Sequence, residues 1–165
     1  MTYAGAGFVL LSSDLDYVLL VHDARSGKWG FPKGHRESYD PDNLATAVRE
    51  LFEETGLVPT QYTILSSTFK IHKGSQSYLF RYARLNNDMN KVVLNAGSPE
   101  EIAELKWIPL ADLLSANTVL DGNKYLRTWI ADIKNEQTRR VSSLFWSIKK
   151  TFPSDIPVST TNVVT

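Results

Sequence analysis

Three glutamates and an arginine lie within six consecutive residues of this chain, as Arg49, Glu50, Glu53 and Glu54. If residues 42–55 form a helix, positions three and four apart share a face, and the three carboxylates project from one side of it. Like charges at this spacing repel each other, and a hard divalent cation with oxygen ligands is the usual compensation. Arg49 precedes Glu53 by four residues and can restrain its carboxylate. The stretch therefore favours a metal site over the simpler alternative, a solvated charged helix face.

The opposite face of the same segment is apolar and gives the helix a surface to pack against a core. Its members recur at helical spacing: Leu44, Ala45, Ala47, Val48, Leu51 and Phe52. Asp40 and Pro41 form a start signal, an N-cap acceptor followed by proline at the first helical position. Gly56 is the expected stop, because glycine adopts the left-handed cap conformation without steric cost.

The run from Arg49 to Leu57, RELFEETGL, resembles the second half of the Nudix box, R-E-U-x-E-E-x-G-U with U aliphatic. The first half differs. Gly34 is one residue too far from Arg49, and the position of the first glutamate holds Asp40 or Pro41. We interpret this as a one-residue insertion in the loop before the helix. The resemblance covers residues 3–114 and implies an α/β fold, an α/β/α sandwich with a mixed β-sheet and the Nudix loop–helix–loop.

The resemblance also implies an activity: magnesium-dependent hydrolysis of a phosphoanhydride bond in a nucleoside diphosphate linked to another group, with Mn²⁺ as a substitute ion. The metal ligands it implies are Glu50, Glu53, Glu54 and the main-chain carbonyl of Lys33. The catalytic residues it implies are Glu50, Glu53 and Glu101, with Glu104 as the alternate for Glu101. Either Glu50 or Glu101 accepts the proton of the attacking water. Structural support is expected from Gly34, Arg49 and Gly56.

Two further strands are expected over residues 61–71 and 75–84, joined by a tight turn at residues 72–74. Basic side chains gather there and could meet a polyphosphate, although a solvated hairpin tip explains them equally well. Tyr78 alternates with Phe80 and Tyr82 on one strand face, where most such rings belong to the core and one could stack on a base. The residues expected to bind substrate are Lys33, His35, Lys70, Lys73, Tyr78 and Arg81.

The lead-in to the box, WGFPKGH over residues 29–35, bears on the substrate. Its P-K-G-H part resembles the diadenosine-polyphosphate hydrolases, and W-G-F-P-K-G resembles the mRNA-decapping branch. A dinucleoside polyphosphate is the first expectation, and capped mRNA or a diphosphoinositol polyphosphate comes after it. A non-catalytic nucleotide-binding module is the alternative from another class. Phe31 is expected in the core, whereas Trp29 is left open between core packing and ligand contact.

The remaining features fit one globular domain. The chain has 165 residues, no net charge and no cysteine, which excludes disulfides and thiolate metal sites. Strands are expected over residues 4–11 and 17–22, a last strand near residues 99–109, a short helix at 110–114, and closing helices at 125–133 and 138–149. We expect a domain over residues 1–152 and a disordered tail over 153–165. We also expect a cytoplasmic or nuclear location, a small-molecule nucleotide partner, RNA as a less favoured one, and no membrane contact.

Overall fold

The computed structural model describes residues 2–115 and 120–139. In the described residues the order is β1 to β4, then α1, then β5 to β7, and finally the two helices α2 and α3. The strands are β1 (Gly5–Leu11), β2 (Tyr17–Asp23), β3 (Trp29–Gly30), β4 (Lys33–His35), β5 (Tyr62–Lys73), β6 (Gln76–Leu85) and β7 (Ile102–Pro109). The helices are α1 (Asn43–Thr55), α2 (Leu110–Leu113) and α3 (Lys124–Arg139), with short 3₁₀ turns at Pro59–Gln61 and Met89–Lys91.

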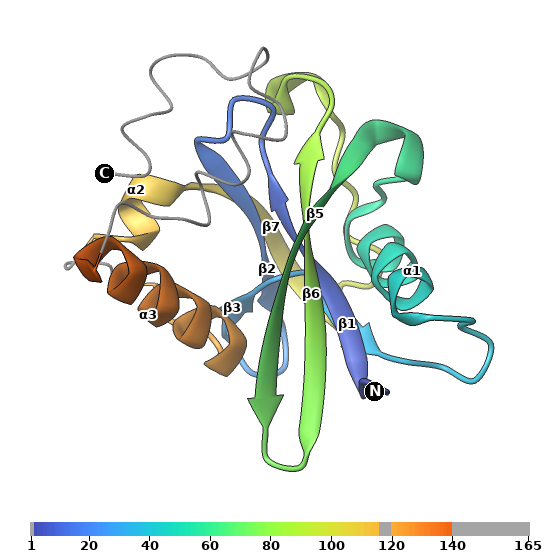
Figure 1. Ribbon diagram of the computed structural model, residues 1–165. Helices are drawn as coiled ribbons and strands as arrows, with labels where there is room; N and C mark the ends of the chain where they lie inside the picture. The colour runs from blue at the N-terminus through green and yellow to red at the C-terminus, as the bar shows by residue number, and fades with distance from the viewer. Residues whose placement is uncertain (1, 116–119, 140–165) are drawn as a thin grey trace.

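The strands form a mixed sheet with β1 at its centre. The order is β3-β2-β1-β6-β5, with β4 paired to β1 and β7 paired to β2. The β1–β6 pair is parallel, from Gly5 opposite Tyr78 to Leu11 opposite Arg84, and the other pairs are antiparallel. All seven residues of β1 are buried, as expected for a strand covered on both faces. Figure 1 shows α1 on one side of the sheet and α2 and α3 on the other.

Each face of the sheet has its own hydrophobic core. On the α3 side, Phe31, Phe80 and Trp129 pack together, and the Trp129 indole Nε1 donates a hydrogen bond of 2.7 Å to the Tyr82 hydroxyl. On the α1 side, Phe8 and Leu51 lie in a second cluster. Alternate residues of β1 and β6 enter the two cores, since successive side chains of a strand point to opposite faces. The predicted α/β/α sandwich is therefore confirmed.

The caps of α1 correct one prediction and confirm another. The N-cap is Asp42, whose carboxylate accepts a hydrogen bond from the Ala45 main-chain N–H at 2.8 Å, and not Asp40. The Asp40 carboxylate instead forms an ion pair with Arg49. Gly56 ends the helix as predicted, with a φ of 80° and a main-chain hydrogen bond to the Phe52 carbonyl.

The other predicted elements agree with the structure to within a few residues, including the short helix α2. The expected helix at 125–133 is part of the longer α3. Most of the predicted helix at 138–149 and the whole predicted tail at 153–165 lie outside the described residues. No helix in the described ranges is long and apolar enough to cross a membrane.

Candidate active site

Arg49 and Asp40 form the centre of the loop–helix–loop. The guanidinium of Arg49 donates from Nε to Asp40 Oδ1 at 3.0 Å and from Nη2 to Oδ2 at 2.8 Å. Asp40 is 6% exposed and also accepts from the Thr46 hydroxyl and the Glu37 main-chain N–H, each at 2.9 Å. These bonds, the one from Arg49 first, hold the pKa of Asp40 well below its usual range. Asp40 thus pairs with the box arginine despite the extra residue in the loop.

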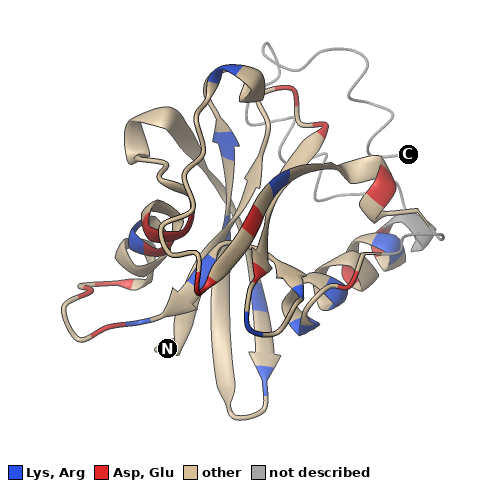
Figure 2. Cartoon of the chain, turned by 180° about the vertical axis from the view of Figure 1, so that it is seen from behind, with Lys and Arg blue, Asp and Glu red and all other residues tan. Residues whose placement is uncertain are grey.

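The same arginine restrains two of the three glutamates. Its Nη1 lies 2.9 Å from Glu50 Oε1 and 3.2 Å from Glu53 Oε2, and its Nη2 donates to the His35 carbonyl. The predicted restraint of Glu53 four residues on is confirmed. In Figure 2 basic and acidic segments lie next to each other on α1, as this network requires. Glu53 remains half exposed, whereas the Glu50 side chain is only 14% exposed.

Glu54 lies under the loop that leads into the helix. Its Oε1 accepts a hydrogen bond of 2.9 Å from the Lys33 main-chain N–H. Burial raises the pKa of Glu54 to about 8, and the negative charges of Glu50 and Glu101 add to this effect. Burial also raises the pKa of Glu50, against the opposing influence of Arg49. Two neighbouring carboxylates therefore carry a penalty for ionisation, which a nearby cation would remove.

A divalent cation suits this donor set chemically, although the carboxylates are not gathered around one point. Within residues 2–115 and 120–139, no three acidic or histidine side chains stand close enough to share an ion as they are. Glu50 and Glu53 are drawn instead toward Arg49. Glu54 faces the loop, and its desolvated carboxylate and that of Glu50 are hard oxygen donors of the kind that Mg²⁺ prefers. The residues fit a magnesium ion once Glu50 shifts part of its bonding from Arg49.

Gly34 leaves the space in which the Glu50 carboxyl group lies. A β-carbon at residue 34 would collide with the carboxyl carbon and both oxygens of Glu50. We expect Gly34→Ala to displace this carboxylate and to lower kcat by about a hundredfold, while the fold persists because the end of a glutamate side chain can move. Gly27→Ala is the matched control: it meets open space at a φ of 71°, and should lower stability by about 1 kcal/mol with activity kept. For both variants, activity assays measure the change in kcat and thermal unfolding measures the change in stability. Equal activity in Gly34→Ala and the parent chain would contradict it.

Beside the acidic residues, two lysines lie over the ring of one tyrosine. The Lys33 Nζ is 4.9 Å from the centre of the Tyr125 ring and 5.4 Å from that of Tyr78, and the Lys73 Nζ is 5.4 Å from the Tyr125 ring. Burial lowers the pKa of Lys33; Glu54 and Glu50 oppose this shift, and the charge of Lys73 adds to it. The Tyr78 hydroxyl also contacts His35 Nδ1 at 3.1 Å. The Tyr125 ring therefore contacts both lysine side chains and compensates part of their positive charge.

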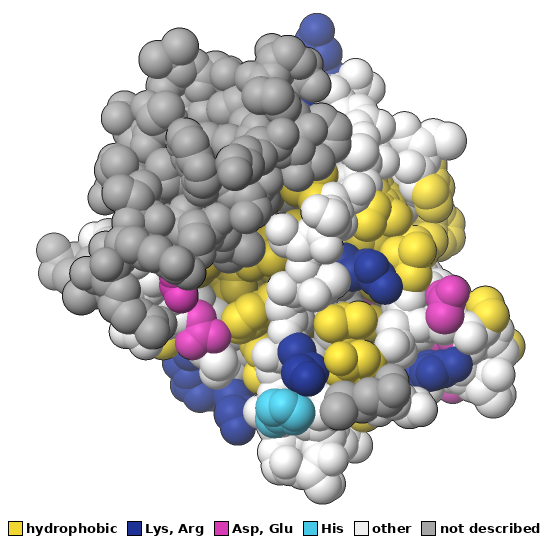
Figure 3. Space-filling model, viewed as in Figure 1, with side chains coloured by type: hydrophobic (Ala, Val, Ile, Leu, Met, Phe, Trp, Pro, Cys, Tyr) yellow, Lys and Arg dark blue, Asp and Glu magenta, His cyan; other side chains and the backbone are white. Residues whose placement is uncertain are grey.

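The structure brings together only part of the predicted substrate-binding set. On β5 and β6, Lys73 shares the α3-facing side with Tyr78, whereas Lys70 and Arg81 alternate onto the other side of the sheet. The ring of Tyr78 is 3% exposed, so it supports Lys33 and His35 and offers no open face to a base. On the face seen in Figure 3, basic side chains and a histidine gather over the lower part of the molecule, where Figure 1 shows the β5–β6 hairpin.

Two residues change the interpretation made from the sequence. Tyr125 was not among the predicted site residues, because it lies at the start of α3 and reads as one more apolar position of that helix. The signal in the sequence for a place at the edge of the core was its position next to Lys124 and a preceding polar turn. Glu101 is exposed and forms an ion pair with Arg25 at 3.7 Å. Its negative charge makes a small contribution to the raised pKa of Glu54.

An α/β/α sandwich that carries its acidic residues on a loop–helix–loop defines the class, and comparison with known proteins gives the family. The family model for the NUDIX domain matches residues 1–130, and the chain belongs to this family. Members of this family hydrolyse nucleoside diphosphates linked to another group.

The individual relatives described next share less than a third of their aligned residues with this chain. The chain is 29% identical over 136 residues to the m7GpppN-mRNA hydrolase dcap-2 of Caenorhabditis elegans. The match covers 72% of this chain but only 16% of that protein. A crystal structure of a C. elegans Ap4A hydrolase binary complex is 25% identical, with a TM-score of 0.61, and covers 79% of this chain and 98% of its own. The Nudix hydrolase RenU from M. smegmatis has the same fold, at 21% identity and a TM-score of 0.62 over 83% of this chain and 86% of its own.

Proposed function

We propose that this chain is a magnesium-dependent hydrolase of the phosphoanhydride bonds in a dinucleoside polyphosphate such as diadenosine tetraphosphate. The observation that carries the proposal is the continuity between the acidic residues and the paired lysines. Lys33 contacts Glu54 through its main chain and shares the Tyr125 ring with Lys73 through its side chain. A chain of several phosphates can follow this line, with one end at a metal and the other at the two ammonium groups.

Each residue has a distinct task in this proposal. Glu50 and Glu54, together with Glu53 and the carbonyl of Lys33, would hold magnesium, which supplies charge neutralisation for phosphate oxygens during attack by water. Asp40 keeps Arg49 in place, and Arg49 limits where Glu50 and Glu53 can move. Glu50 is favoured over Glu101 as proton acceptor, since burial raises its pKa towards neutrality and Glu101 is exposed in an ion pair.

The raised pKa of Glu54 predicts a pH dependence for metal binding. A carboxylate with a pKa of about 8 is mostly protonated at neutral pH, and a magnesium ion must displace that proton. We expect the Kd for Mg²⁺ to rise by about tenfold for each unit of pH below 8, as measured by calorimetry in two buffers of different ionisation enthalpy. Magnesium binding should also release the proton of Glu54 into solution. The Glu54 carboxyl is mostly protonated between about pH 6 and pH 8. A Kd that stays constant over this range would contradict the assignment of Glu54 as a ligand.

A comparison of substrates tests the proposed function itself. The full chain with MgCl₂ is offered diadenosine tetraphosphate, capped RNA, ADP-ribose and a diphosphoinositol polyphosphate, and the products are separated by chromatography. The expected result is the highest kcat/KM for diadenosine tetraphosphate. A preference for capped RNA would favour the second candidate, which rests on the similarity to dcap-2. Tight nucleotide binding without turnover of any substrate would favour a binding module and refute the enzyme proposed here.

Two lysines of one strand provide a matched pair for the phosphate path. We expect Lys73→Ala to raise the KM for diadenosine tetraphosphate by about tenfold with little change in kcat, because the removed charge contacts phosphates away from the reacting bond. Lys70→Ala removes the same charge from the opposite face of β5 and should leave KM within about twofold. Steady-state kinetics at matched ionic strength give both values. Equal effects of the two variants would show that general attraction, and no specific path, is responsible.

A further inference from the structure

The chain between β6 and β7 crosses the C-terminal end of α1, the end that carries two of the three glutamates. Its residues 92–98 contain no helix or strand. Figures 1 and 2 show this part of the chain passing beside α1 on its way to β7. Val92 and Leu94 are partly buried against the core on the α1 side, whereas Val93 between them is 85% exposed. Alternate side chains therefore anchor the 92–98 segment to the body of the protein.

The 92–98 segment supplies a hydrogen-bond partner to the main chain of the last helical turn. The last carbonyl groups of a helix find no donor within the helix itself. At the end of α1 the Phe52 carbonyl accepts from the Gly56 N–H at 2.8 Å, and the Thr55 carbonyl accepts from the Asn95 N–H at 2.9 Å. The turn that carries the glutamates is therefore capped in part by a residue from outside the helix.

Gly97 lies against the main-chain carbonyl of Glu53, within the same turn. A β-carbon at residue 97 would collide with that carbonyl oxygen. The oxygen belongs to the main chain of α1, so it cannot swing aside as the end of a long side chain does. Residue 97 is therefore a glycine because two stretches of backbone approach each other closely here.

The loop before α1 and the segment after β6 act on different parts of the same two glutamates. Arg49 and the Lys33 N–H hold the carboxylates of Glu53 and Glu54. Residues 95–97 hold the main chain to which these side chains are attached. The last turn of a helix is the part that frays, and a metal ligand on it needs a fixed backbone as well as a fixed carboxylate.

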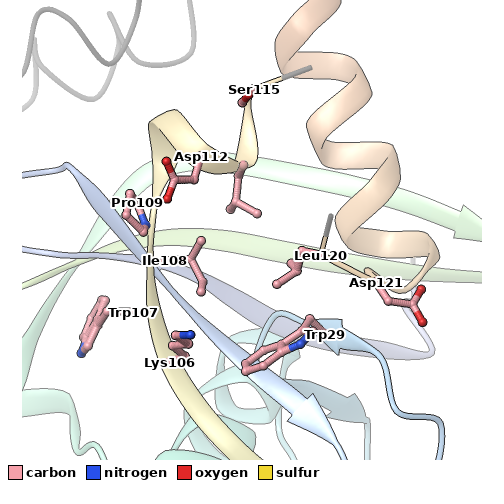
Figure 4. Close-up of a pocket in the computed structure, with 10 residues that line it drawn as sticks. Trp29, Lys106, Trp107, Ile108, Pro109, Asp112, Ser115, Leu120 and Asp121 are labelled. Atoms are coloured by element: carbon pink, nitrogen blue, oxygen red, sulfur yellow. The ribbon is translucent and has the colours of Figure 1, made fainter. Parts of the chain in front are cut away.

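We propose that Gly97 is a positioning residue for Glu53 and Glu54, acting through the main chain of the last turn of α1. The inference rests on the proposed function, in which these two carboxylates hold magnesium. Its packing on the Glu53 carbonyl keeps the Cα–Cβ bonds of both residues in the directions that the site requires. The cavity of about 690 Å³ beside β7, drawn in Figure 4, takes no part, because none of its lining residues belongs to the 92–98 segment.

Gly97→Ala tests the proposal, and Val93→Ala is the matched control in the same segment. We expect Gly97→Ala to raise the Kd for Mg²⁺ by about tenfold, as is usual when a group that orients a metal ligand is changed. Val93→Ala removes a side chain that points to solvent and should leave this Kd within about twofold. Calorimetry of the full chain gives the values. A Kd within about twofold of the parent in Gly97→Ala, or a parent chain that binds no Mg²⁺, would overturn the proposal.

A second variant and a measurement without metal separate positioning from a loss of stability. Leu94→Ala releases the segment without adding bulk, should raise the Kd by about threefold, and decides the outcome if Gly97→Ala does not fold. In both variants, hydrogen exchange followed by NMR should be at least about tenfold faster at the Asn95 and Gly56 amides, with a smaller change at Phe8 in β1. Equal acceleration at all three amides with an unchanged Kd would show a loss of stability alone and refute the positioning role.

The readouts also separate this inference from the proposed function. Turnover of diadenosine tetraphosphate tests the proposed function, whereas metal affinity and amide exchange test the role of Gly97. The expected shifts in both, without turnover of any of the four substrates, would refute the proposed function and support the role of Gly97. Turnover by the parent chain with an unchanged Kd in Gly97→Ala would do the reverse.

Discussion

Glu54→Gln is expected to lower kcat by about a thousandfold, which corresponds to about 4 kcal/mol of lost transition-state stabilisation. The amide keeps an oxygen to accept the hydrogen bond from the Lys33 N–H, so the loop stays in place. It loses the negative charge that a magnesium ion needs, and weaker metal binding should accompany the loss of rate. Steady-state kinetics over a range of MgCl₂ concentrations measure both effects. The matched control is Glu100→Gln, an exposed residue of the turn before β7, which should retain full activity.

The stability of the same variant checks the electrostatic explanation. Because the folded-state pKa of Glu54 is raised, its stabilising contribution is complete below the unfolded value of about 4.5 and is lost as the pH rises through about 8. At a pH of about 8.5, the Glu54 carboxylate of the parent chain is mostly ionised and its stabilising contribution is lost. Without metal, Glu54→Gln should therefore melt no lower than the parent chain at this pH. A variant that is both inactive and clearly less stable at this pH would indicate a structural role for Glu54, and a fully active one would remove it from the site.

Asp40→Ala is expected to destabilise the fold by about 3 kcal/mol, because it leaves the guanidinium of Arg49 without its buried partner. The change also removes the acceptor for Thr46 and for the Glu37 main-chain N–H. For a chain of this size the melting temperature should fall by about 6 to 12 °C, as calorimetry can measure. Asp42→Asn is the control, since asparagine caps a helix about as well as aspartate and should change stability very little.

Acid provides an independent check on Asp40. Its pKa is depressed in the folded state, so its stabilising contribution is present above the unfolded value of 3.8 and is lost as the pH falls below it. The difference in stability between the parent chain and Asp40→Ala should therefore shrink as the pH is lowered below about 4. A constant difference down to strongly acidic pH would mean that packing, and not the ion pair with Arg49, explains the effect.

Local patterns in the sequence predicted the elements well, because each pattern depends on neighbouring residues. The alternation in β5 and β6 and the helical spacing in α1 gave those elements to within a few residues. The N-cap was wrong for a physical reason: two aspartates precede the helix, and the long-range pairing of Asp40 with Arg49 leaves Asp42 as the cap. Local propensity does not distinguish two equivalent acceptors when one of them has a partner elsewhere in the fold.

The site was predicted in part, and the limit was again the distance along the chain. The spacing of Glu50, Glu53 and Glu54 pointed to a shared helix face, and the position of Arg49 predicted its contact with Glu53 but not its contact with Glu50. Side chains alternate between the two faces of a strand, so the sequence spacing already implies that Lys70 and Lys73 lie on opposite faces of β5. The prediction did not assign this strand to a face of the sheet and so did not distinguish the two lysines. The contribution of Tyr125 depends on α3 packing near β6, which no pattern in the sequence encodes.

The parallel pairing of β1 with β6 has a consequence for synthesis of the protein. Gly5 is matched to Tyr78 and Leu11 to Arg84, so this edge of β1 stays open until β6 has been made, whereas the earlier strands β2 and β4 pair with its other edge. At roughly 5 to 20 residues per second, an entirely buried strand would wait several seconds on the ribosome before its central neighbour emerges. During that interval an apolar segment is exposed in the nascent chain, and a chaperone that binds extended hydrophobic peptides would have its best opportunity to engage it there.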